Sequence, residues 1–470
     1  MEPETKESKT NTEIRCVEFD FKCGTNSEDK RKALYGFARL LIEKHHIKTI
    51  KDRNREIYIF RDGVYFYGEE IVKKEIREVF KEHVSSHNVR EIIETVKDLT
   101  PTERDEFQVD PNIINLNNGI FDINTWSFKS HDPLYLFLTK IPMNFKEGAE
   151  CPVIKKFLED VLDEEQIRVI QEWAGFLLYR KYFIKKALIC VGEGDTGKST
   201  LLNLLNIFMG RQNVSSITLQ KISNDKFSSS SLYNKHVNIS DDLSFKDIND
   251  GGTFKMVTGG GPIGGEEKFK TQFTFINFAK LTFSCNKIPD VKDSDDKAYF
   301  KRWIVLRFNY PVEEKDKDAR LIEKMTSEEE LAGFLNFALI GLKRLLENEQ
   351  FSYDKNQDEI KAEMQNTSSS IAMFAHNCLE ISSDDWISKE DMYEAYKKYA
   401  LENKVITETK SRFGRRITRY ANYIQDGKPA NQETGKQITA WMGVQFKDPL
   451  DFEFPKEEIT EQSDFMEEIS

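Results

Sequence analysis

One glycine-rich run has the residue types and the spacing of a phosphate-binding loop. Gly192-Glu193-Gly194-Asp195-Thr196-Gly197-Lys198-Ser199 matches the pattern G-x-x-x-x-G-K-[ST] without a gap. The glycines let backbone N–H groups curl around a β-phosphate, and a helix that begins there aims its N-terminus at the same phosphates. Lys198 would reach the β- and γ-phosphates, and the Ser199 hydroxyl would bind Mg²⁺. We therefore predict an ATP and Mg²⁺ site over 192–200, in which Thr200 packs or caps rather than binding metal.

Polar side chains that directly follow two apolar runs could complete this site. Asp241 and Asp242 follow one run, and Asn286 follows the next. An acidic pair beside the loop can hold the water shell of Mg²⁺ and polarise the attacking water, although an exposed acidic turn is the alternative. The amide could orient that water or sense the γ-phosphate. We predict that Asp241, Asp242 and Asn286 act in catalysis with Lys198, and that Asp241 joins Ser199 as a metal ligand.

Arg302 is the candidate for a charge supplied by a neighbouring subunit. It lies just before the apolar run 303–308. An arginine held at a subunit edge can reach a neighbour's nucleotide and stabilise charge in the transition state. The alternative is a surface arginine or one with a local carboxylate partner, and Lys301 and Arg307 compete for the role. We count Arg302 among the predicted catalytic residues.

The elements that must position these side chains follow an α/β pattern. Residues 187–191 form a short continuous apolar run, which is typical of a buried parallel strand. The glycine-rich loop leads from this run into a predicted helix over 199–209. Further strands are expected at 237–240, 280–285 and 303–308. The loop therefore stands between a strand and a helix, as phosphate binding requires.

Helices and short strands are expected on both sides of this α/β segment, from apolar spacing and from an Asp-Gly turn. They are a helix over 29–45, a hairpin of 57–60 and 64–67 around Asp62-Gly63, one charged helix over 69–96, short strands within 113–131, a helical region over 152–182 interrupted near Asp163, and helices over 328–346, 388–403 and 411–423.

A basic helical face is predicted near the C-terminus. Residues 410–420 contain five basic residues and no acid. At helical spacing the apolar side chains share one face, which would pack inward: Phe413, Ile417, Tyr420 and Ile424. The arginines gather on the other face: Arg412, Arg415, Arg416 and Arg419. This face could lie along DNA, or it could be a solvated face or one docked on an acidic tail.

Composition bounds the class of protein. A net charge of −12 argues, taken alone, against a nucleic-acid binder, because phosphate contacts need a positive surface. No apolar run is long enough for a membrane span, and the polar first ten residues are not expected to be a secretory signal. We expect an intracellular protein in the host cytoplasm, or in the nucleus of a eukaryotic host. The scattered cysteines are expected to be reduced, mostly buried thiols: Cys16, Cys23, Cys151, Cys190, Cys285 and Cys378.

The order of these elements resembles that of superfamily 3 helicases, and specifically the phage and plasmid primase-helicase family that includes the poxvirus primase-helicase. The resemblance runs from about residue 50 to 445. It is carried by the stretches Asn117–Asp122, Cys151-Pro152 and Gln171–Phe176, by the loop 192–199, by Asp241-Asp242, by Asn286 with Pro289, and by Arg302.

The resemblance implies a fold and a mechanism. The expected fold class is α/β, with an AAA+-like P-loop ATPase core, an N-terminal α+β accessory domain and a C-terminal winged-helix domain. It implies a homo-hexameric ring that moves 3′ to 5′ on single-stranded or forked DNA. A stretch from Phe254 to Lys270 resembles the family's DNA-contacting hairpin or loop, and implies DNA contacts by Lys255, Lys268 and Lys270, whose charges can grip phosphates without reading sequence.

The sequence also departs from the family pattern. Gly261 stands at a position that is often acidic in the family, and Asp242 at one that is usually Glu. Lys301 stands at a position that is often Arg. The chain has too little room for the upstream primase-polymerase domain of many relatives, so a separate primase or polymerase is an expected partner. The expected boundaries are a disordered 1–30, the accessory domain 31–150, a helical collar 151–183, the ATPase core 184–312, a helical lid 313–375, the winged helix 376–446 and an acidic tail 447–470.

Three functions remain open at this stage. The first is an ATP-dependent replicative DNA helicase of a virus or plasmid. The second is an ATP-dependent origin-binding initiator or loader that unwinds little. The third is a small-molecule P-loop enzyme such as a kinase, which would be a monomer with ATPase activity indifferent to DNA.

Overall fold

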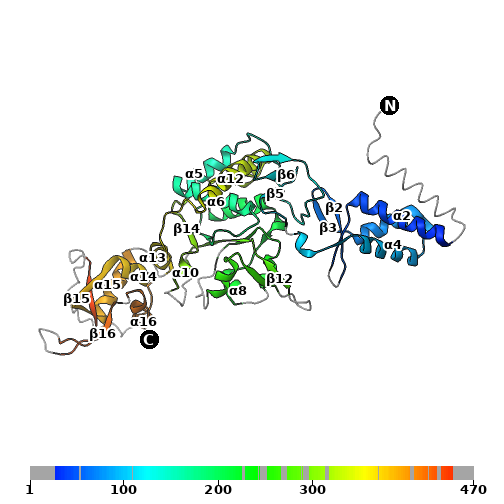
Figure 1. Cartoon of the computed structure of the whole chain (residues 1–470). Coiled ribbons are helices and arrows are strands. Elements are labelled where there is room, and N and C mark those ends of the chain that lie inside the picture. Colours follow the sequence, from blue (N-terminus) through cyan, green and yellow to red (C-terminus); the bar gives the residue numbers. More distant parts are fainter. Residues whose placement is uncertain are drawn as a thin grey trace, which may run out of the picture. The chain divides into compact units, whose positions relative to one another are not determined.

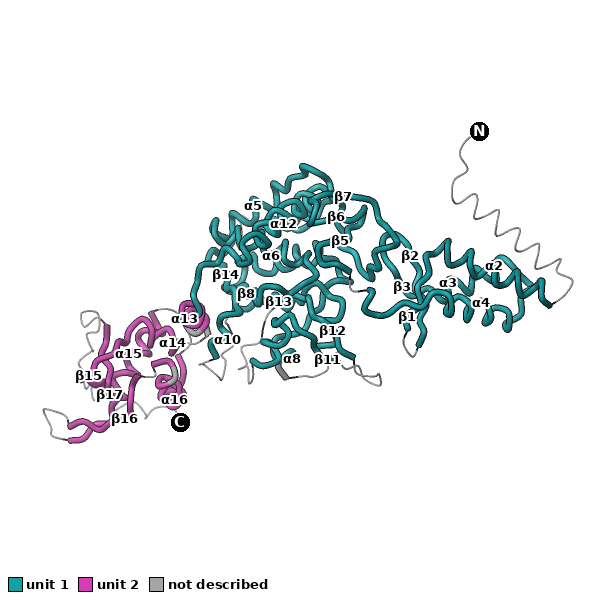
Figure 2. The backbone as a smooth tube through the Cα atoms, viewed as in Figure 1, with its two compact units in different colours: residues 1–286, 291–357 teal, residues 287–290, 358–470 magenta. Residues whose placement is uncertain are grey.

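A computed structural model describes the chain in two compact units (Figures 1 and 2). Unit 1 comprises residues 1–286 and 291–357, and unit 2 comprises residues 287–290 and 358–470. The described residues are 27–51, 54–107, 109–224, 228–241, 243, 251–265, 273–286, 288, 296–312, 317–368, 370–402, 407–421, 423–430 and 436–447. Each unit is treated by itself.

Unit 1 begins with a small α+β layer. Three helices pack on a sheet of order β3-β2-β1-β4, in which β1 and β4 are parallel and the other pairs antiparallel. The elements are α2 (Ser27–His45), β1 (Lys48–Ile50), β2 (Ile57–Arg61), β3 (Val64–Tyr67), α3 (Glu69–Phe80), η1 (Lys81–His83), α4 (Ser86–Leu99), β4 (Pro101–Thr102) and η2 (Arg104–Phe107). The predicted hairpin is confirmed, and both Asp62 and Gly63 have positive φ, as a tight two-residue turn requires.

The prediction of one helix over 69–96 is wrong. Helix α3 ends because Lys81 takes a φ of 49°, outside the helical region. Helix α4 then begins anew with a capping box, in which the Ser85 side chain accepts from the Asn88 N–H. Apolar periodicity continues through both helices, so it could not reveal the break.

A second layer of unit 1 lies over the central sheet. The antiparallel strands β5 (Ile113–Asn115), β6 (Ile120–Asp122) and β7 (Ser127–Lys129) lead to helices α5 (Pro152–Val161) and α6 (Glu164–Leu178), which lie beside α12 (Glu328–Asn348) (Figure 1). The predicted interruption near Asp163 is confirmed, since Asp163 caps α6.

Buried acids fix these helices to one another. The fully buried Glu172 of α6 accepts from Arg344 Nε at 2.6 Å and from the Ser352 N–H at 2.7 Å. Glu330 of α12 accepts from the first backbone N–H groups of α5, those of Val153 and Ile154, at 3.2 and 3.0 Å. Charged side chains are buried here because each carboxylate has several donors.

The central sheet has five parallel strands in the order β14-β8-β13-β10-β9. They are β8 (Ala187–Gly192), β9 (Val214–Ser215), β10 (Val237–Ser240), β13 (Lys280–Cys285) and β14 (Trp303–Phe308). The four predicted strands are confirmed. The edge strand β9, with two residues, is too short to show a pattern.

Further elements lie between the strands of this sheet or, in the case of α11, after its last strand. They are α7 (Lys198–Met209), η3 (Arg211–Asn213), α8 (Leu219–Asn224), η4 (Ser228–Leu232), α9 (Gly252–Val257), β11 (Pro262–Gly265), β12 (Phe273–Ile276), α10 (Lys297–Phe300) and α11 (Leu321–Met325). Strands β11 and β12 form an antiparallel hairpin with Ile263 opposite Phe275. The implied hairpin over 254–270 is thus corrected in part, since its first residues belong to helix α9.

Unit 2 combines helices with an antiparallel sheet of order β15-β17-β16. Its elements are α13 (Gln357–Ser368), α14 (Ser370–Cys378), β15 (Leu379–Ser388), α15 (Lys389–Glu402), α16 (Lys410–Tyr420), β16 (Gln425–Gly427) and β17 (Ala440–Phe446). The predicted inward face of α16 is confirmed for Phe413 and Ile417, which are buried, and Phe413 stacks on Tyr396 at 4.7 Å between ring centroids.

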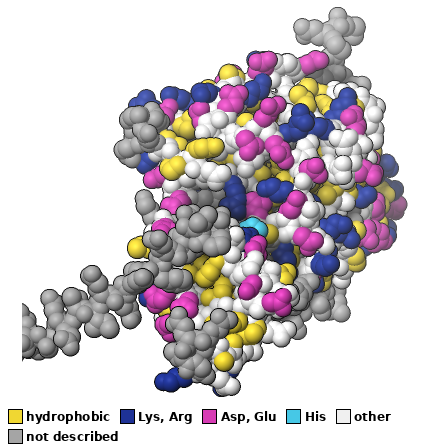
Figure 3. Space-filling view, turned by 90° about the vertical axis from the view of Figure 1, so that its left-hand side faces the viewer, with side chains coloured by type: hydrophobic (Ala, Val, Ile, Leu, Met, Phe, Trp, Pro, Cys, Tyr) yellow, Lys and Arg dark blue, Asp and Glu magenta, His cyan; other side chains and the backbone are white. Residues whose placement is uncertain are grey.

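Within the described ranges, no helix combines the length and the apolar composition needed to cross a bilayer. Cys151, Cys190 and Cys285 are free thiols and buried, and Cys378 is free and half-buried. Cys16 and Cys23 lie outside the described residues. Acidic and basic side chains are interspersed on the face drawn in Figure 3.

Candidate functional site

The glycine-rich loop joins β8 to α7, and packing explains its two motif glycines. A Cβ at Gly192 would meet the Phe308 backbone and lie 3.0 Å from the Phe308 Cβ on the neighbouring strand β14. Gly197 caps α7 with a φ of 89°, and a Cβ there would lie 2.9 Å from a Val161 methyl of α5. A Cβ at Gly194, in contrast, would meet open space. The two glycines that the motif requires, Gly192 and Gly197, therefore lie where β14 and α5 leave no room for a side chain.

The loop is held by its own hydrogen bonds and by a segment after β14. The Thr196 hydroxyl donates to the Glu193 carbonyl at 2.9 Å. The Val312 N–H donates to the Asp195 carbonyl at 2.9 Å, and Lys317 pairs with the Asp195 carboxylate at 3.2 Å. Asp195 itself has a φ of 59°. These contacts fix the curvature of the loop.

Lys198 lies inside the curve of the loop. Its ammonium donates to the Glu193 carbonyl and to the Thr196 hydroxyl, the latter at 3.3 Å. Burial lowers the pKa of Lys198 from its ordinary value, and the nearby Asp241 opposes that shift. The amine is therefore placed where phosphate oxygens could take over its bonds to the loop.

The predicted residues of the carboxyl edge line one cavity. It has a volume of about 280 Å³ and contains the loop together with the ends of β10 and β13: Gly194, Asp195, Thr196, Gly197, Lys198, Ser199, Thr200, Asp241, Ser284, Cys285 and Asn286. Parallel strands bring these ends together at one edge of the sheet. Polar and backbone groups dominate the lining that the described residues provide, so the cavity suits a phosphate chain. Asp242 lies outside the described residues.

Sequence reasoning missed Ser284 and Cys285. The Ser284 hydroxyl donates to the Asp241 carboxylate, because the β10–β13 register sets Ser240 opposite Phe283 and so brings the next residues level. Cys285 is buried and lines the cavity. Both precede the predicted Asn286 at a strand end, but their neighbours could not be known without the register.

The residues present fit a magnesium ion held mainly by a nucleotide. No group of three or more His, Cys, Asp or Glu side chains suited to a metal occurs among the described residues. Mg²⁺ commonly uses one or two protein oxygens and completes its octahedron with water and phosphate oxygens. Ser199 and Asp241 in the same cavity supply that number of ligands.

Arg302 lies at the opposite edge of the sheet from the loop. Its carbonyl accepts from the N–H of Ala187, the first residue of β8, whereas Gly192 ends that strand. Six strand residues span about 20 Å at the usual rise, so Arg302 is far from the loop of its own subunit. Its Nε donates to the Thr258 hydroxyl at 3.0 Å, and burial lowers its pKa. Within the described part of the chain it forms no ion pair with a carboxylate.

The candidate DNA contacts differ in their surroundings. Lys255 pairs with Asp296 at 2.6 Å, so its charge is partly compensated. In unit 2, Arg412 and Arg415 are exposed, and Arg412 also pairs with Glu408 at 3.1 Å. Arg416 is half-buried. Lys268, Lys270 and the side chain of Arg419 lie outside the described residues.

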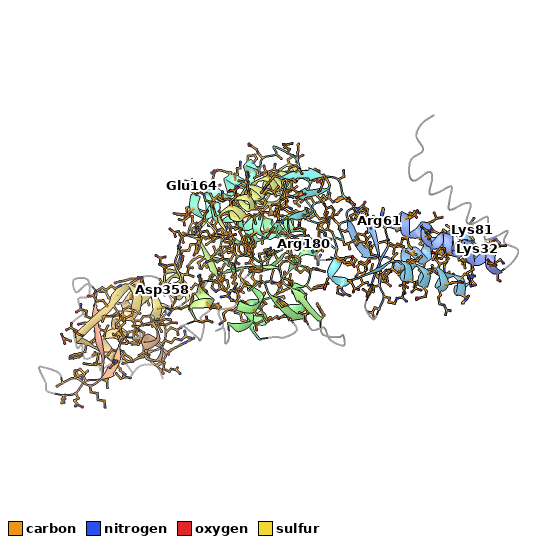
Figure 4. The ribbon with its side chains drawn as sticks, viewed as in Figure 1. Lys32, Arg61, Lys81, Glu164, Arg180 and Asp358 are labelled. Carbon is orange, nitrogen blue, oxygen red and sulfur yellow. The ribbon has the colours of Figure 1, made fainter. Side chains whose placement is uncertain are left out.

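A second basic cluster lies at the amino edge of the sheet and has a structural explanation. The buried Lys280 donates to the Tyr179 carbonyl, and the buried His236 bonds the Leu177 carbonyl at 3.0 Å. The guanidinium of Arg180, a residue labelled in Figure 4, lies 5.0 Å from the centroid of the Phe278 ring. The last carbonyls of a helix need donors, and Lys280 and His236 bond those at the end of α6. Burial lowers the pKa of both His236 and Lys280 well below their ordinary values.

Comparisons with known proteins match parts of the chain. Residues 24–163 match the family described as "D5 N terminal like", and residues 190–302 match a family of unknown function, DUF5906. The "Putative helicase V13" of Sputnik virophage is 26% identical over 267 residues, which cover 52% of this chain and 34% of that protein. The chain thus spans about a third of the length of that relative. These sequence matches relate the chain to a viral helicase-like protein.

Comparison with solved structures matches two of the NrS-1 C-terminal region without ligand. The A form is 17% identical, covers 87% of this chain and 98% of that chain, and has a TM-score of 0.49. A second structure, of residues 305–718 of that protein, has the same identity and coverage and a TM-score of 0.48.

Proposed function

We propose that this chain is an ATP-driven DNA helicase of a virus or plasmid and works as a homo-hexameric ring. The observation that carries the proposal is the division of the predicted catalytic residues between two edges of one sheet. Lys198, Asp241 and Asn286 line one cavity, and Arg302 lies at the far edge. A residue about 20 Å from its own loop can act on a nucleotide only in a neighbouring subunit.

In this proposal each nucleotide site uses two subunits. Lys198 would bind the β- and γ-phosphates, while Ser199 and Asp241 would hold Mg²⁺, which would neutralise charge on the phosphates. Ser284 fixes the Asp241 carboxylate through its hydroxyl. Asn286 orients the attacking water, with Asp242 as the proposed base. Arg302 of the adjoining subunit stabilises the charge that develops on the transferred phosphoryl group.

DNA contacts are proposed at two places. In the sequence, Lys268 and Lys270 fall between the two strands of the hairpin β11–β12, which follows α9 and the strand β10. The exposed arginines of α16 support a role for unit 2 as a DNA-binding winged helix, since its described residues combine the helices α13, α14, α15 and α16 with a three-stranded sheet.

The proposal is supported by the weak likeness to a viral putative helicase as well as by the site. Its direct test is strand displacement on a forked DNA substrate, with ATPase activity measured with and without DNA. We expect ATP-dependent displacement by the wild type and almost none by Lys198→Ala, because the phosphates lose their buried cation.

The same assay separates the other functions. DNA-stimulated hydrolysis without strand displacement would favour an origin-binding initiator or loader, for which the basic face of α16 is the supporting feature. Hydrolysis indifferent to DNA by a protein that stays monomeric with ATP would favour a small-molecule enzyme and would overturn the proposal.

A further inference from the structure

Thr258 links the segment before the hairpin to Arg302. It caps the C-terminal end of α9 and is fully buried. Its hydroxyl donates to the Phe254 carbonyl at 2.7 Å and accepts from Arg302 Nε at 3.0 Å. One hydroxyl therefore uses its donor on the helix and its acceptor on the arginine.

Helix α9 is fixed to the segment that carries Arg302. The Phe254 ring stacks on Trp303 at 4.7 Å with 12° between the ring planes. Lys255 pairs with Asp296, whose carboxylate also accepts from the Tyr299 N–H at 3.0 Å and so caps α10. These contacts tie α9, α10 and the start of β14 into one body, so that a displacement of α9 reaches the guanidinium.

The hairpin is joined to the same point from both of its ends. After Thr258 the chain passes Gly260, which has a φ of 74° and a backbone so close to the Tyr182 carbonyl that a Cβ would lie 2.5 Å from it. The returning strand β12 ends at Ile276, and Asn277 then donates to the Val257 carbonyl at 2.9 Å. Both ends of the hairpin are therefore attached beside Thr258.

The arginine is held on one side. Arg302 donates through Nε to Thr258 and through Nη1 to the Ala298 carbonyl. Its Nη2 has no partner among the residues that the structure describes. A guanidinium carries five N–H donors in a rigid plane, so fixing Nε sets the direction in which the others are presented.

We propose that Thr258 is a positioning residue that orients Arg302 toward the neighbouring subunit's nucleotide and couples that orientation to the hairpin. This rests on the proposed function, because it takes the trans role of Arg302 as given. Occupation of the hairpin by DNA would shift α9 and adjust the guanidinium, which links DNA binding to hydrolysis in the next subunit.

The test replaces the hydroxyl without changing the side-chain size. In Thr258→Val, kcat for ATP with DNA present should fall about tenfold or more, because a displacement of about 1 Å is enough for such a loss. The KM for ATP should stay within about twofold, and stimulation by DNA should largely disappear. Thr258→Ser, which keeps the hydroxyl, should restore both.

Thr326→Val is the matched control. Thr326 follows α11 as Thr258 follows α9, and its hydroxyl donates to the Ile322 carbonyl at 2.7 Å. Among the described residues its hydroxyl bonds only to carbonyls of its own helix. The control should leave kcat, KM and DNA stimulation unchanged, and a thermal melt of each variant checks that it folds.

A double-mutant comparison separates positioning from general damage. If Thr258 acts through Arg302, then Thr258→Val should cause no further loss in an Arg302→Ala background. An equal loss in both backgrounds, or wild-type kcat and DNA stimulation in Thr258→Val, would overturn the inference. If Thr258→Val does not fold, Thr258→Ala is read by the same criteria. Wild-type rates of ATP hydrolysis in both Lys198→Ala and Arg302→Ala would instead contradict the proposed function itself.

Discussion

Gly192→Ala tests whether the first glycine of the motif is required because the neighbouring strand β14 leaves no room for a side chain. The added Cβ would lie 3.0 Å from the Phe308 Cβ, with the Phe308 backbone carbonyl nearer still. Carbon atoms prefer separations of about 3.5–4.0 Å, so β8 and β14 must part there, or the loop must shift, by about 0.5–1 Å. Overpacking of this kind destabilises by about 1–3 kcal/mol.

The shift would also displace the loop N–H groups and Lys198. We expect kcat/KM for ATP to fall about tenfold to a hundredfold, because misplacement on this scale has effects of that size. Gly194→Ala is the control in the same loop, since its Cβ would meet open space and its φ is not positive. It should stay within about twofold of wild type in kcat/KM and within about 0.5 kcal/mol in stability.

The assays are urea unfolding followed by tryptophan fluorescence, and steady-state ATP hydrolysis with DNA. Equal behaviour of the two alanine variants in both assays would refute the packing argument. A loss confined to Gly194→Ala would show that the loop has another shape from the one described here.

Three further predictions concern other parts of the molecule. Ser284→Ala should lower kcat about tenfold and raise the Mg²⁺ concentration needed for half-maximal hydrolysis, because Asp241 loses a hydroxyl donor; a magnesium titration unchanged from wild type would contradict it. The pKa of His236 is lowered in the folded state, so the unfolded chain binds more protons below about pH 6.5, and folding stability should fall on acidification through that window by up to about 1.4 kcal/mol per pH unit. His236→Asn, which keeps a donor, should reduce the slope of folding stability against pH in urea unfolding at pH 5 to 7. An equal slope in the variant and the wild type would contradict the assignment of this pH dependence to His236. Arg415→Ala should weaken DNA binding and reduce its salt slope by about one unit, as read from fluorescence anisotropy across salt concentrations, and an unaltered slope would make the basic face of α16 irrelevant.

The central sheet was predictable because its strands are buried on both faces. Continuous apolar runs are the signature of such strands, and β10, β13 and β14 have the predicted bounds. The loop was predictable because its glycines and Lys198 are fixed by local geometry. The break after Phe80 was not, because it depends on a backbone angle at Lys81 and a cap at Ser85 that apolar periodicity does not record.

The partners of site residues were not predictable because they are distant along the chain. Ser284 meets Asp241, and Thr258 meets Arg302, across separations of 43 and 44 residues. Each pairing follows from the strand register or from the docking of α9, which one sequence does not reveal. The same holds for Lys255, which pairs with Asp296 at the start of α10.

The proposal that subunits share a catalytic site is tested most directly by mixing two variants that are each expected to be inactive. Lys198→Ala lacks the phosphate-binding amine but keeps Arg302, and Arg302→Ala has the reverse defect. In randomly mixed rings about a quarter of the head-to-tail interfaces would combine an intact loop with an intact arginine. We predict that the equimolar mixture regains hydrolysis toward about a quarter of the wild-type rate under subunit-exchange conditions. A mixture that exchanges subunits and stays as inactive as its components would contradict the shared site.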